Sequence, residues 1–559
     1  MTSSILAAAA TALRLLAIPA VAAPSLAIPA VTIPAVTIPS LAVTVPSLAV
    51  PATAHAVAGP SLAVTVPSLA VPATAHAVAG PSLAGARAVP HGLVEPWPAV
   101  PPDLAAREVS FRGAGGLEMH GTVLSPAAAG PGRRGIVLVH GAGSGTPRTK
   151  LMEEAVQFAR RGLSVLVYDK RSVGYSLFRR SYSQLADDAL GAVAALRSQP
   201  GVDPAKVGIW GLSEGGWVAP LAASRSADVA FVVLVGANAL QPLRQQTWAV
   251  AAGLRKAGVS GSLVDRTEPN LYRAISDGGM FPEPYYDPAP VLASLRQPVL
   301  AIWGTYDLLT PPRETPPLLA KALESGGNRR YTFRFFGEAD HAAHRTPDGG
   351  VTRLPELAPG YADLVGSWTA AAIAGKAPLT SVSGPTPVQA SPTVTVDPPA
   401  WWESANAQAA ALALMLVAFT AYPATTVVRR LRGRARPAAS RAARLLSAGG
   451  LTSVAGSFGY VFYLVMTGGK LATTGPVAAG RPLIWLVLQA LAVTTAAATA
   501  VVASGLLHGR APRAGDQATG DLPHLGGRPG RGERVRLGLL LAGGVVFLPW
   551  ALYWGLLLP

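Results

Sequence analysis

The chain has 559 residues, half of them apolar and 14% charged, whereas soluble domains carry about 25% charged residues. A chain of this length folds as two or more units, and the shortage of charge predicts membrane-spanning segments. It contains no cysteine, which excludes disulfides, a thiol nucleophile and cysteine-ligated metal sites. Most of its net charge of +16 lies beyond residue 403 in short loops between apolar runs, which argues against a nucleic-acid partner.

The N-terminal region combines an apolar start with a repeat. Residues 1–23 are apolar, carry one charged side chain at Arg14 and end in small residues, so we interpret them as a secretory signal peptide or an uncleaved anchor. Residues 24–104 are rich in Pro, Ala and Val, and the segment 39–59 recurs unchanged at 60–80. Frequent proline predicts extended chain. We interpret the repeat as a duplicated linker, with a binding array as the alternative.

Residues 105–375 alternate between short aliphatic runs and helix-like stretches. Near-continuous apolar strands separated by helices predict an α/β fold with a mostly parallel sheet covered on both faces. An alternating segment at the start predicts an entering antiparallel hairpin, and an insertion at about 237–297, with a helix at 241–258, is expected to form a cap. The strand regions are expected at 135–143, 163–171, 206–216, 231–236, 298–304 and 331–337.

The pentapeptide Gly211–Gly215 has the pattern G-x-S-x-G with Ser213 at its centre. Alone this pattern is weak, but here it follows an expected strand and precedes an Ala-rich helix-like run. A nucleophile elbow needs such a strand-to-helix turn, with flanking glycines because a side chain there would collide with neighbouring backbone. We therefore predict that Ser213 is a catalytic nucleophile.

A serine hydroxyl reacts only if a base removes its proton and a third group holds that base. Asp307 follows the penultimate strand and His341 follows the last one, in the order expected after Ser213. We predict Asp307 as the orienting acid and His341 as the base. His344 is the alternative base, and Asp340 is expected to be a loop residue because adjacency does not bring it to the far nitrogen of the imidazole.

Two preorganised donors are needed for the developing oxyanion. The backbone N–H of Glu214 is expected to be one and that of Ala142, in the turn after the first parallel strand, the other. His140 in the same turn is expected to be structural. The Glu214 carboxylate is expected to point to solvent or to meet a substrate cation.

These residues together resemble the α/β-hydrolase superfamily, in particular its dienelactone-hydrolase, serine-aminopeptidase and acyl-thioesterase-like bacterial branches. The resemblance covers about 105–375 and implies an eight-stranded sheet and cleavage of an ester, thioester or amide bond through an acyl-enzyme, without a metal or an organic cofactor. Ser172 stands where a glycine is common. The motifs that carry the resemblance are His140–Gly143, Tyr168–Ser176, Gly211–Gly216, Gly304–Asp307 and Gly337–His341.

A Pro/Ser/Thr-rich linker at 376–402 precedes a C-terminal membrane region, 403–559. Its four apolar runs are free of internal charge and long enough to cross a bilayer. The loops after the first and third runs are rich in arginine, which predicts that they are cytoplasmic and that the hydrolase domain and the C-terminus are extracytoplasmic. The runs lie at about 405–428, 449–468, 483–507 and 537–558.

The sequence therefore predicts a membrane-tethered extracytoplasmic serine hydrolase, carboxylesterase- or lipase-like, with a small or lipidic acyl substrate. A peptidase or an acyltransferase with the same triad is the close alternative. A transport or signalling protein whose hydrolase fold only binds a ligand is the alternative of another class, which the charge-free spans argue against. Four cap aromatics could line an acyl site or form cap core: Trp248, Tyr272, Tyr285 and Tyr286.

Overall fold

By its internal contacts, the computed structural model separates Met1–Ala77 from a second unit, Val78–Pro559. The predictions for the signal segment, the repeat and much of the arginine-rich loops concern residues outside those that the structure describes. The described residues are 100–128, 130–176, 178–376, 380–433, 441–466, 474–507 and 531–559. All of them lie in the second unit.

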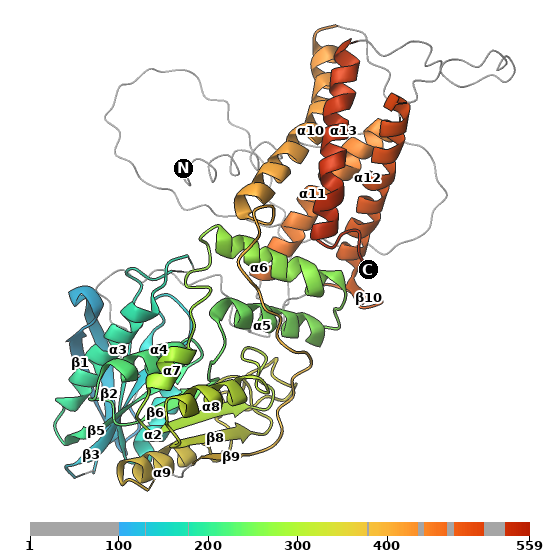
Figure 1. The fold of residues 1–559 in the computed structure, drawn as a ribbon. Helices are drawn as coiled ribbons and strands as arrows, with labels where there is room; N and C mark the ends of the chain where they lie inside the picture. The colour runs from blue at the N-terminus through green and yellow to red at the C-terminus, as the bar shows by residue number, and fades with distance from the viewer. Residues whose placement is uncertain are drawn as a thin grey trace, which may run out of the picture. The chain divides into compact units, whose positions relative to one another are not determined.

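A nine-stranded sheet forms the centre of the α/β part among the described residues (Figure 1). Its order is β1-β2-β4-β3-β5-β6-β7-β8-β9; the first two strands are antiparallel, and β3 to β9 run parallel. The predicted hairpin and parallel sheet are thus confirmed. The strands are Leu104–Arg112, Glu118–Pro126, Arg133–Val139, Leu163–Tyr168, Val202–Leu212, Val232–Val235, Val299–Gly304, Tyr331–Phe336 and Ser381–Ser383.

The sheet has one strand more than the eight that the resemblance implies. The extra strand, β9, comes from the segment expected to be a linker, where Val382 pairs with Phe333 of β8. Further along this segment, Ser391 O accepts a hydrogen bond from Trp248 Nε1 at 2.9 Å, and Val396 is buried. Residues 380–397 therefore form an edge strand and a strap packed on the cap, since edge pairing needs only backbone groups and leaves little sequence signal.

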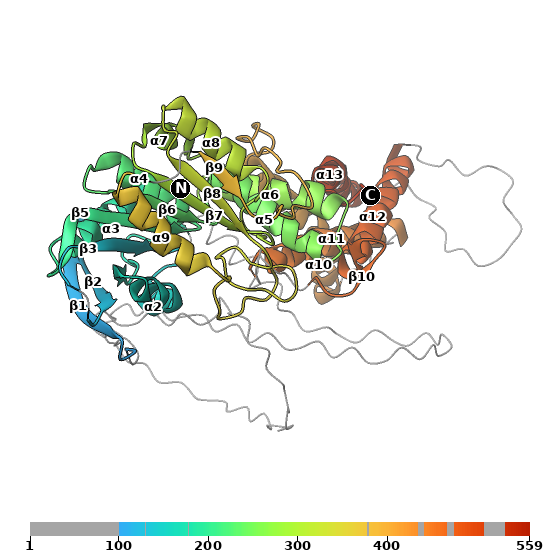
Figure 2. The ribbon, with the colours of Figure 1, turned by 90° about the horizontal axis from the view of Figure 1, so that it is seen from below.

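Side chains of the central strands alternate between two cores, one on each face of the sheet. Val137 and Val139 of β3 point into one core, and Ile136 and Leu138 point into the other. The first core is covered by α3 (Tyr182–Arg197), α4 (Gly215–Arg225), α7 (Ala289–Ser294) and α8 (Thr315–Ser325), and the second by α2 (Met152–Arg160) and α9 (Tyr361–Ile373). Figure 2 shows these two helix layers on opposite sides of the sheet.

The insertion between β6 and β7 forms the cap, which we define as residues 237–297. Its main helices are α5 (Pro242–Lys256) and α6 (Glu268–Asp277), joined by a short π-helix. The expected helix at 241–258 is confirmed as α5. Apolar side chains of the cap share one buried cluster with the C-terminal helices; Leu254 and Leu271 are members from the cap, and Trp550 is a member from the other side.

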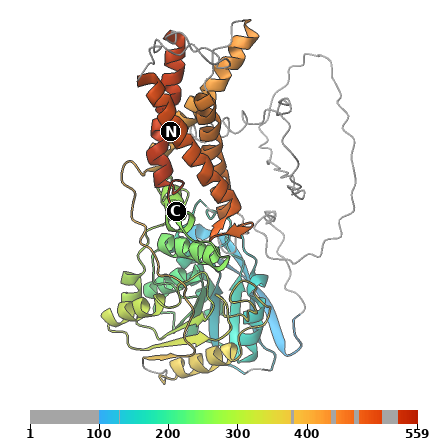
Figure 3. The same ribbon diagram turned by 90° about the vertical axis from the view of Figure 1, so that its right-hand side faces the viewer.

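Four long helices, α10 to α13, form the C-terminal bundle and lie alongside one another (Figures 1 and 3). Each is long and apolar enough to cross a membrane, as expected. Small residues allow close packing: a Cβ at Gly543 would lie 2.6 Å from Ala418 Cβ. The helices span Ala405–Leu431, Arg441–Met466, Leu483–Leu507 and Arg531–Tyr553.

Candidate active site

Ser213 lies at the sharp turn between β5 and α4, as predicted. Its backbone has φ 56°, in the left-handed region that side chains other than glycine rarely adopt. The flanking glycines are required sterically, since a Cβ at Gly211 would lie 2.1 Å from Gly215 O, and a Cβ at Gly215 would lie 2.7 Å from Val139 O. The strained turn projects the Ser213 side chain out of the carboxyl end of the parallel strands.

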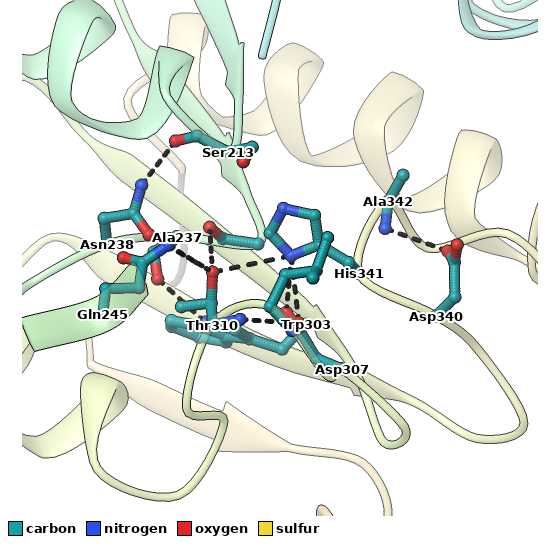
Figure 4. A network of polar contacts seen from close by, with 12 residues as sticks. Ser213, Ala237, Asn238, Gln245, Trp303, Asp307, Thr310, Asp340, His341 and Ala342 are labelled. Carbon is teal, nitrogen blue, oxygen red and sulfur yellow. Dashed lines mark hydrogen bonds and ion pairs between the residues drawn. The ribbon is translucent and has the colours of Figure 1, made fainter. Parts of the chain in front are cut away.

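Asp307 and His341 meet beside this turn. His341 Nδ1 lies 2.9 and 3.0 Å from the two carboxylate oxygens of Asp307, and Asp307 Oδ1 also accepts bonds from the backbone N–H groups of Leu309 and Thr310 at 2.8 Å. These contacts assign the Nδ1–H tautomer to the neutral ring and leave the Nε2 lone pair free to accept a proton. Nε2 is buried and has no hydrogen-bond partner among the described residues. Figure 4 shows the imidazole between Asp307 and Ser213.

Asn238 and Thr310 hold Ser213 and His341 in place through hydrogen bonds (Figure 4). Asn238 Nδ2 donates to Ser213 O at 2.5 Å, and Thr310 Oγ1 donates to Asn238 Oδ1 at 3.2 Å and lies 3.5 Å from His341 Nδ1. The sequence offered no signal for either residue, because both act through tertiary contacts rather than through a motif.

The alternative base, His344, is held in another place. Its Nε2 lies 3.1 Å from Glu154 Oε1 and its Nδ1 lies 3.0 Å from Leu354 O. Asp340 is a loop residue as expected: its carboxylate accepts bonds from the backbone N–H groups of Ala342 and His344. Among the candidates, His341 is therefore the histidine whose ring contacts Asp307.

The turn His140–Gly143 lies against the elbow, since a Cβ at Gly141 would lie 3.3 Å from Ser213 Cβ. His140 is buried, and its Nε2 donates to Tyr168 O at 2.8 Å. Burial, helped by the charge of Lys170, lowers the pKa of His140 to about 4, so the ring is neutral near pH 7 and links two strand ends. Ala142, one of the two predicted oxyanion donors, belongs to this turn, and Glu214, the other, follows Ser213 in the elbow.

The carboxylate of Glu214 does not point to solvent, so this expectation was wrong. It is 2% exposed and lies 2.5 Å from Lys170 Nζ and 3.1 Å from Arg180 Nη1, while Tyr175 Oη donates to it at 2.9 Å. Burial opposes its charge, but Lys170 and Arg180 outweigh this and hold the pKa of Glu214 below its usual range. Burial also lowers the pKa of Lys170, against the attraction of Glu214. We take the group as ionic, because two cations face one carboxylate.

The cap aromatics pack against other side chains. Trp248 and Tyr272 are buried, and the Tyr286 ring packs at 4.9 Å between centroids against Tyr182 of α3. These contacts favour the interpretation of the aromatics as cap core. Among the described residues, no three His, Asp or Glu side chains come together as candidate metal ligands.

Residues 175–355 match the model of the prolyl oligopeptidase family. A polyketide transferase of Penicillium crustosum is 32% identical over 139 residues, 23% of this chain and 43% of that protein. A thiohydrolase of Aspergillus aculeatus is 33% identical over 132 residues, 23% of this chain and 40% of that protein. The chain thus spans less than half the length of these curated relatives.

Among solved structures, an acylaminoacyl peptidase of Pyrococcus horikoshii is similar at 19% identity, covering 43% of this chain and 38% of that one, with a TM-score of 0.33. The topology of the domain and the family match together identify its fold. The parallel sheet follows the order described above, and the motif serine stands at a strand–turn–helix. The part of the chain from β1 to β9 therefore has the α/β-hydrolase fold, and its residues 175–355 are similar to a family of serine hydrolases.

Proposed function

We propose that the chain is a membrane-tethered serine hydrolase that cleaves an acyl bond through Ser213, His341 and Asp307. The observation that carries the proposal is the buried contact between His341 Nδ1 and Asp307 at 2.9 Å, because it leaves Nε2 free on the side of Ser213. The proposal has three catalytic side chains and requires no cofactor.

The chemistry follows from this arrangement. Ser213 Oγ bonds to the carbonyl carbon while its proton moves to His341 Nε2, and Asp307 stabilises the imidazolium. The backbone N–H groups of Ala142 and Glu214 hold the oxyanion. Collapse breaks the bond to the leaving group, which takes the proton from Nε2. Water then attacks the acyl-enzyme and gives one proton to His341, which returns it to Ser213 as the acid is released.

The substrate class that we propose is a carboxylic ester, small or lipidic. The names of the curated relatives favour two alternatives with the same triad, a thioester substrate and acyl transfer, and the family match favours a third, a peptide bond. A panel of acyl esters, acyl thioesters and aminoacyl amides, assayed with the full-length protein, separates these classes by their values of kcat/KM.

The triad is tested by labelling the full-length protein in detergent with a fluorophosphonate probe. Labelling forms a bond from Ser213 Oγ to phosphorus, expels fluoride and passes the serine proton to His341. We expect labelling of the wild type, none in Ser213→Ala, and strongly slowed labelling in His341→Ala and Asp307→Ala. A folded wild type that does not label would overturn the hydrolase proposal and favour a ligand-binding role in transport or signalling.

We also propose that the bundle crosses the cell membrane with the hydrolase domain outside. Arginines support this orientation: Arg429 and Arg430 end α10, and Arg531, Arg534 and Arg536 begin α13, so these ends are expected in the cytoplasm. No background thiol exists in this chain, so single cysteines report topology directly.

Ser325→Cys is exposed on α8 of the hydrolase domain, and Gly532→Cys has open space around its Cβ at the start of α13. An impermeant maleimide applied to intact cells is expected to label the first and spare the second until the cells are lysed. The reverse pattern would overturn the orientation.

A further inference from the structure

Lys170 contacts the back of the turn that carries Ala142. Its Nζ donates to Gly141 O at 2.6 Å. The peptide bond between Gly141 and Ala142 is trans, as are all peptide bonds of the described residues, so its C=O and N–H point in opposite directions. With the oxygen held by the ammonium group, the Ala142 N–H is turned away from Lys170. A cation on the carbonyl also polarises the peptide and strengthens its N–H as a donor.

The same ammonium group reaches the elbow. Lys170 Nζ lies 2.5 Å from Glu214 Oε1, and the backbone N–H of Glu214 is the second proposed oxyanion donor. Tyr175 forms a parallel link, since its Oη accepts from Gly143 N at 3.3 Å and donates to Glu214 at 2.9 Å. Two side chains therefore connect the turn 141–143 to the elbow across space, independently of the main chain.

The charges of this cluster are buried and therefore hold their positions. Lys170 and Glu214 are 6% and 2% exposed, and Arg180 adds a second cation at 3.1 Å from Glu214. A buried ion pair contributes little to stability when compared with an apolar pair of the same shape, but it fixes geometry, because a displaced buried charge is costly. Here the ion pair would fix the distance between the backbone N–H groups of Ala142 and Glu214.

We propose that Lys170, Tyr175 and the carboxylate of Glu214 are positioning residues that set the two oxyanion donors, Ala142 N–H and Glu214 N–H. The inference rests on the proposed function, because an oxyanion forms only if Ser213 attacks an acyl carbon. Donors aimed at the developing oxyanion act on the transition state more than on the bound substrate. Loss of the cluster therefore lowers kcat and leaves KM nearly unchanged.

A neighbouring ion pair supplies the matched control. Arg171 follows Lys170 in the chain, and its Nε lies 2.7 Å from Asp188 Oδ2, with both side chains almost fully buried. This pair binds Ala114, whose N–H and C=O contact Asp188 and Arg171. It therefore joins the β1–β2 hairpin to α3, and among the described residues its side-chain hydrogen bonds reach neither the triad nor the turn 140–143.

The experiment uses the full-length protein in detergent, because the cap packs on the bundle. The variants are Lys170→Met, Tyr175→Phe, and Lys170→Met/Glu214→Gln, with Arg171→Met/Asp188→Asn as the control. Each is characterised by its fluorophosphonate labelling rate, by kcat and KM on an acyl p-nitrophenyl ester, and by its thermal unfolding midpoint. Tyr175→Phe removes only one hydroxyl, so it remains informative if the charge variants do not fold.

We expect Lys170→Met and the double variant to lower kcat and the labelling rate about 10- to 100-fold, somewhat less than the loss of a whole oxyanion donor. KM is expected to change by no more than about twofold, because the substrate pocket is untouched. Tyr175→Phe is expected to lower kcat and the labelling rate about three- to tenfold, since the hydroxyl that joins Gly143 to Glu214 is lost. The control is expected to lower the unfolding midpoint without lowering kcat.

Two results would overturn the positioning role. One is a folded Lys170→Met protein, or a folded Tyr175→Phe protein if the former does not fold, with wild-type kcat and labelling rate. The other is a control pair that loses the same fraction of kcat at the same loss of stability. A wild type that fails to label is a different result, since it contradicts the proposed function itself.

Discussion

Two buried glutamates show how differently the active site and the junction between cap and bundle are held together. Glu214 beside Ser213 faces two cations and a tyrosine hydroxyl, and its pKa is held low. Glu268 at the start of α6 is 3% exposed, neither carboxylate oxygen has a hydrogen-bond partner among the described residues, and burial raises its pKa well above the usual range.

The difference separates two tasks. Around Ser213, paired polar groups fix distances, which chemistry requires, whereas at the junction apolar packing joins two parts and tolerates a neutral acid. Polar contacts also cross the junction, many of them to backbone groups. Thr267 Oγ1 and Asn270 Nδ2 donate to the carbonyls of Trp554 and Tyr553 at 2.6 and 2.7 Å. Substitutions at the active site are therefore expected to change rates, and substitutions at the junction are expected to change stability.

The largest effect is expected from His341→Ala, which removes the base and leaves the packing around β7 and β8 in place. We expect kcat on the ester substrate to fall by about 10⁴-fold and the unfolding midpoint to stay close to that of the wild type. The measurement is steady-state hydrolysis beside thermal unfolding. Equal activity of His341→Ala and the wild type would contradict the role of His341 as the base.

A large loss of stability without loss of chemistry is expected from Gly543→Val in α13. A Cβ there would lie 2.6 Å from Ala418 Cβ and 3.3 Å from the Phe419 ring. Valine must therefore push the helices apart, which is expected to lower the free energy of unfolding by about 1–3 kcal/mol. Thermal unfolding in detergent measures it, and the matched control is Gly538→Val on the same helix, where a Cβ meets open space. Equal destabilisation by both substitutions would contradict close packing at Gly543.

A smaller effect is expected from Thr267→Val, which keeps the shape of the side chain and removes its bond to Trp554 O. Breaking the bond leaves a buried carbonyl with one partner fewer and costs about 1 kcal/mol. We expect a lower midpoint, with kcat per folded molecule unchanged. Ser325→Val on the exposed end of α8 serves as a control, and a kcat that falls with Thr267→Val would show that the junction also serves the chemistry.

The smallest effect at mildly acidic pH is expected from Glu268→Gln, whose effect grows as the pH rises. In the unfolded chain the acid ionises near pH 4.3, whereas burial keeps it protonated in the folded state. The folded state then binds more protons, so this residue lowers stability as the pH rises above about 4.5. We expect the substitution to raise the midpoint most at alkaline pH and to flatten its pH dependence between pH 5 and 9, measured by thermal unfolding. A midpoint whose pH dependence is unchanged would contradict a neutral Glu268.

The parts of the fold with a local chemical signal could be predicted from the sequence. The aliphatic runs indicated the parallel strands because both faces of those strands are buried, and the glycines around Ser213 indicated the elbow because no side chain fits there. Asp307 and His341 were predicted as partners from their places after β7 and β8, and the structure brings their side chains into contact.

What the sequence did not indicate depends on contacts between distant segments. The strand β9 pairs through its backbone at the sheet edge, and the partners of Glu214 come from the segment 170–180. Neither feature produces a residue pattern that can be recognised in the sequence. The cap aromatics were expected either to line an acyl site or to form cap core, but part of the apolar surface of α5 and α6 is buried against the bundle, which begins at Ala405, far along the chain.

This last contact has a consequence for the order of folding during synthesis. Ser262 of the cap donates to the carbonyls of Leu558 and Pro559, and Gln489 of α12 donates to Leu558 as well. Because ribosomes add about 5–20 residues per second, the sheet emerges well before these partners exist. The apolar side chains of the cap that pack against the bundle therefore stay uncovered until the last helix has been made.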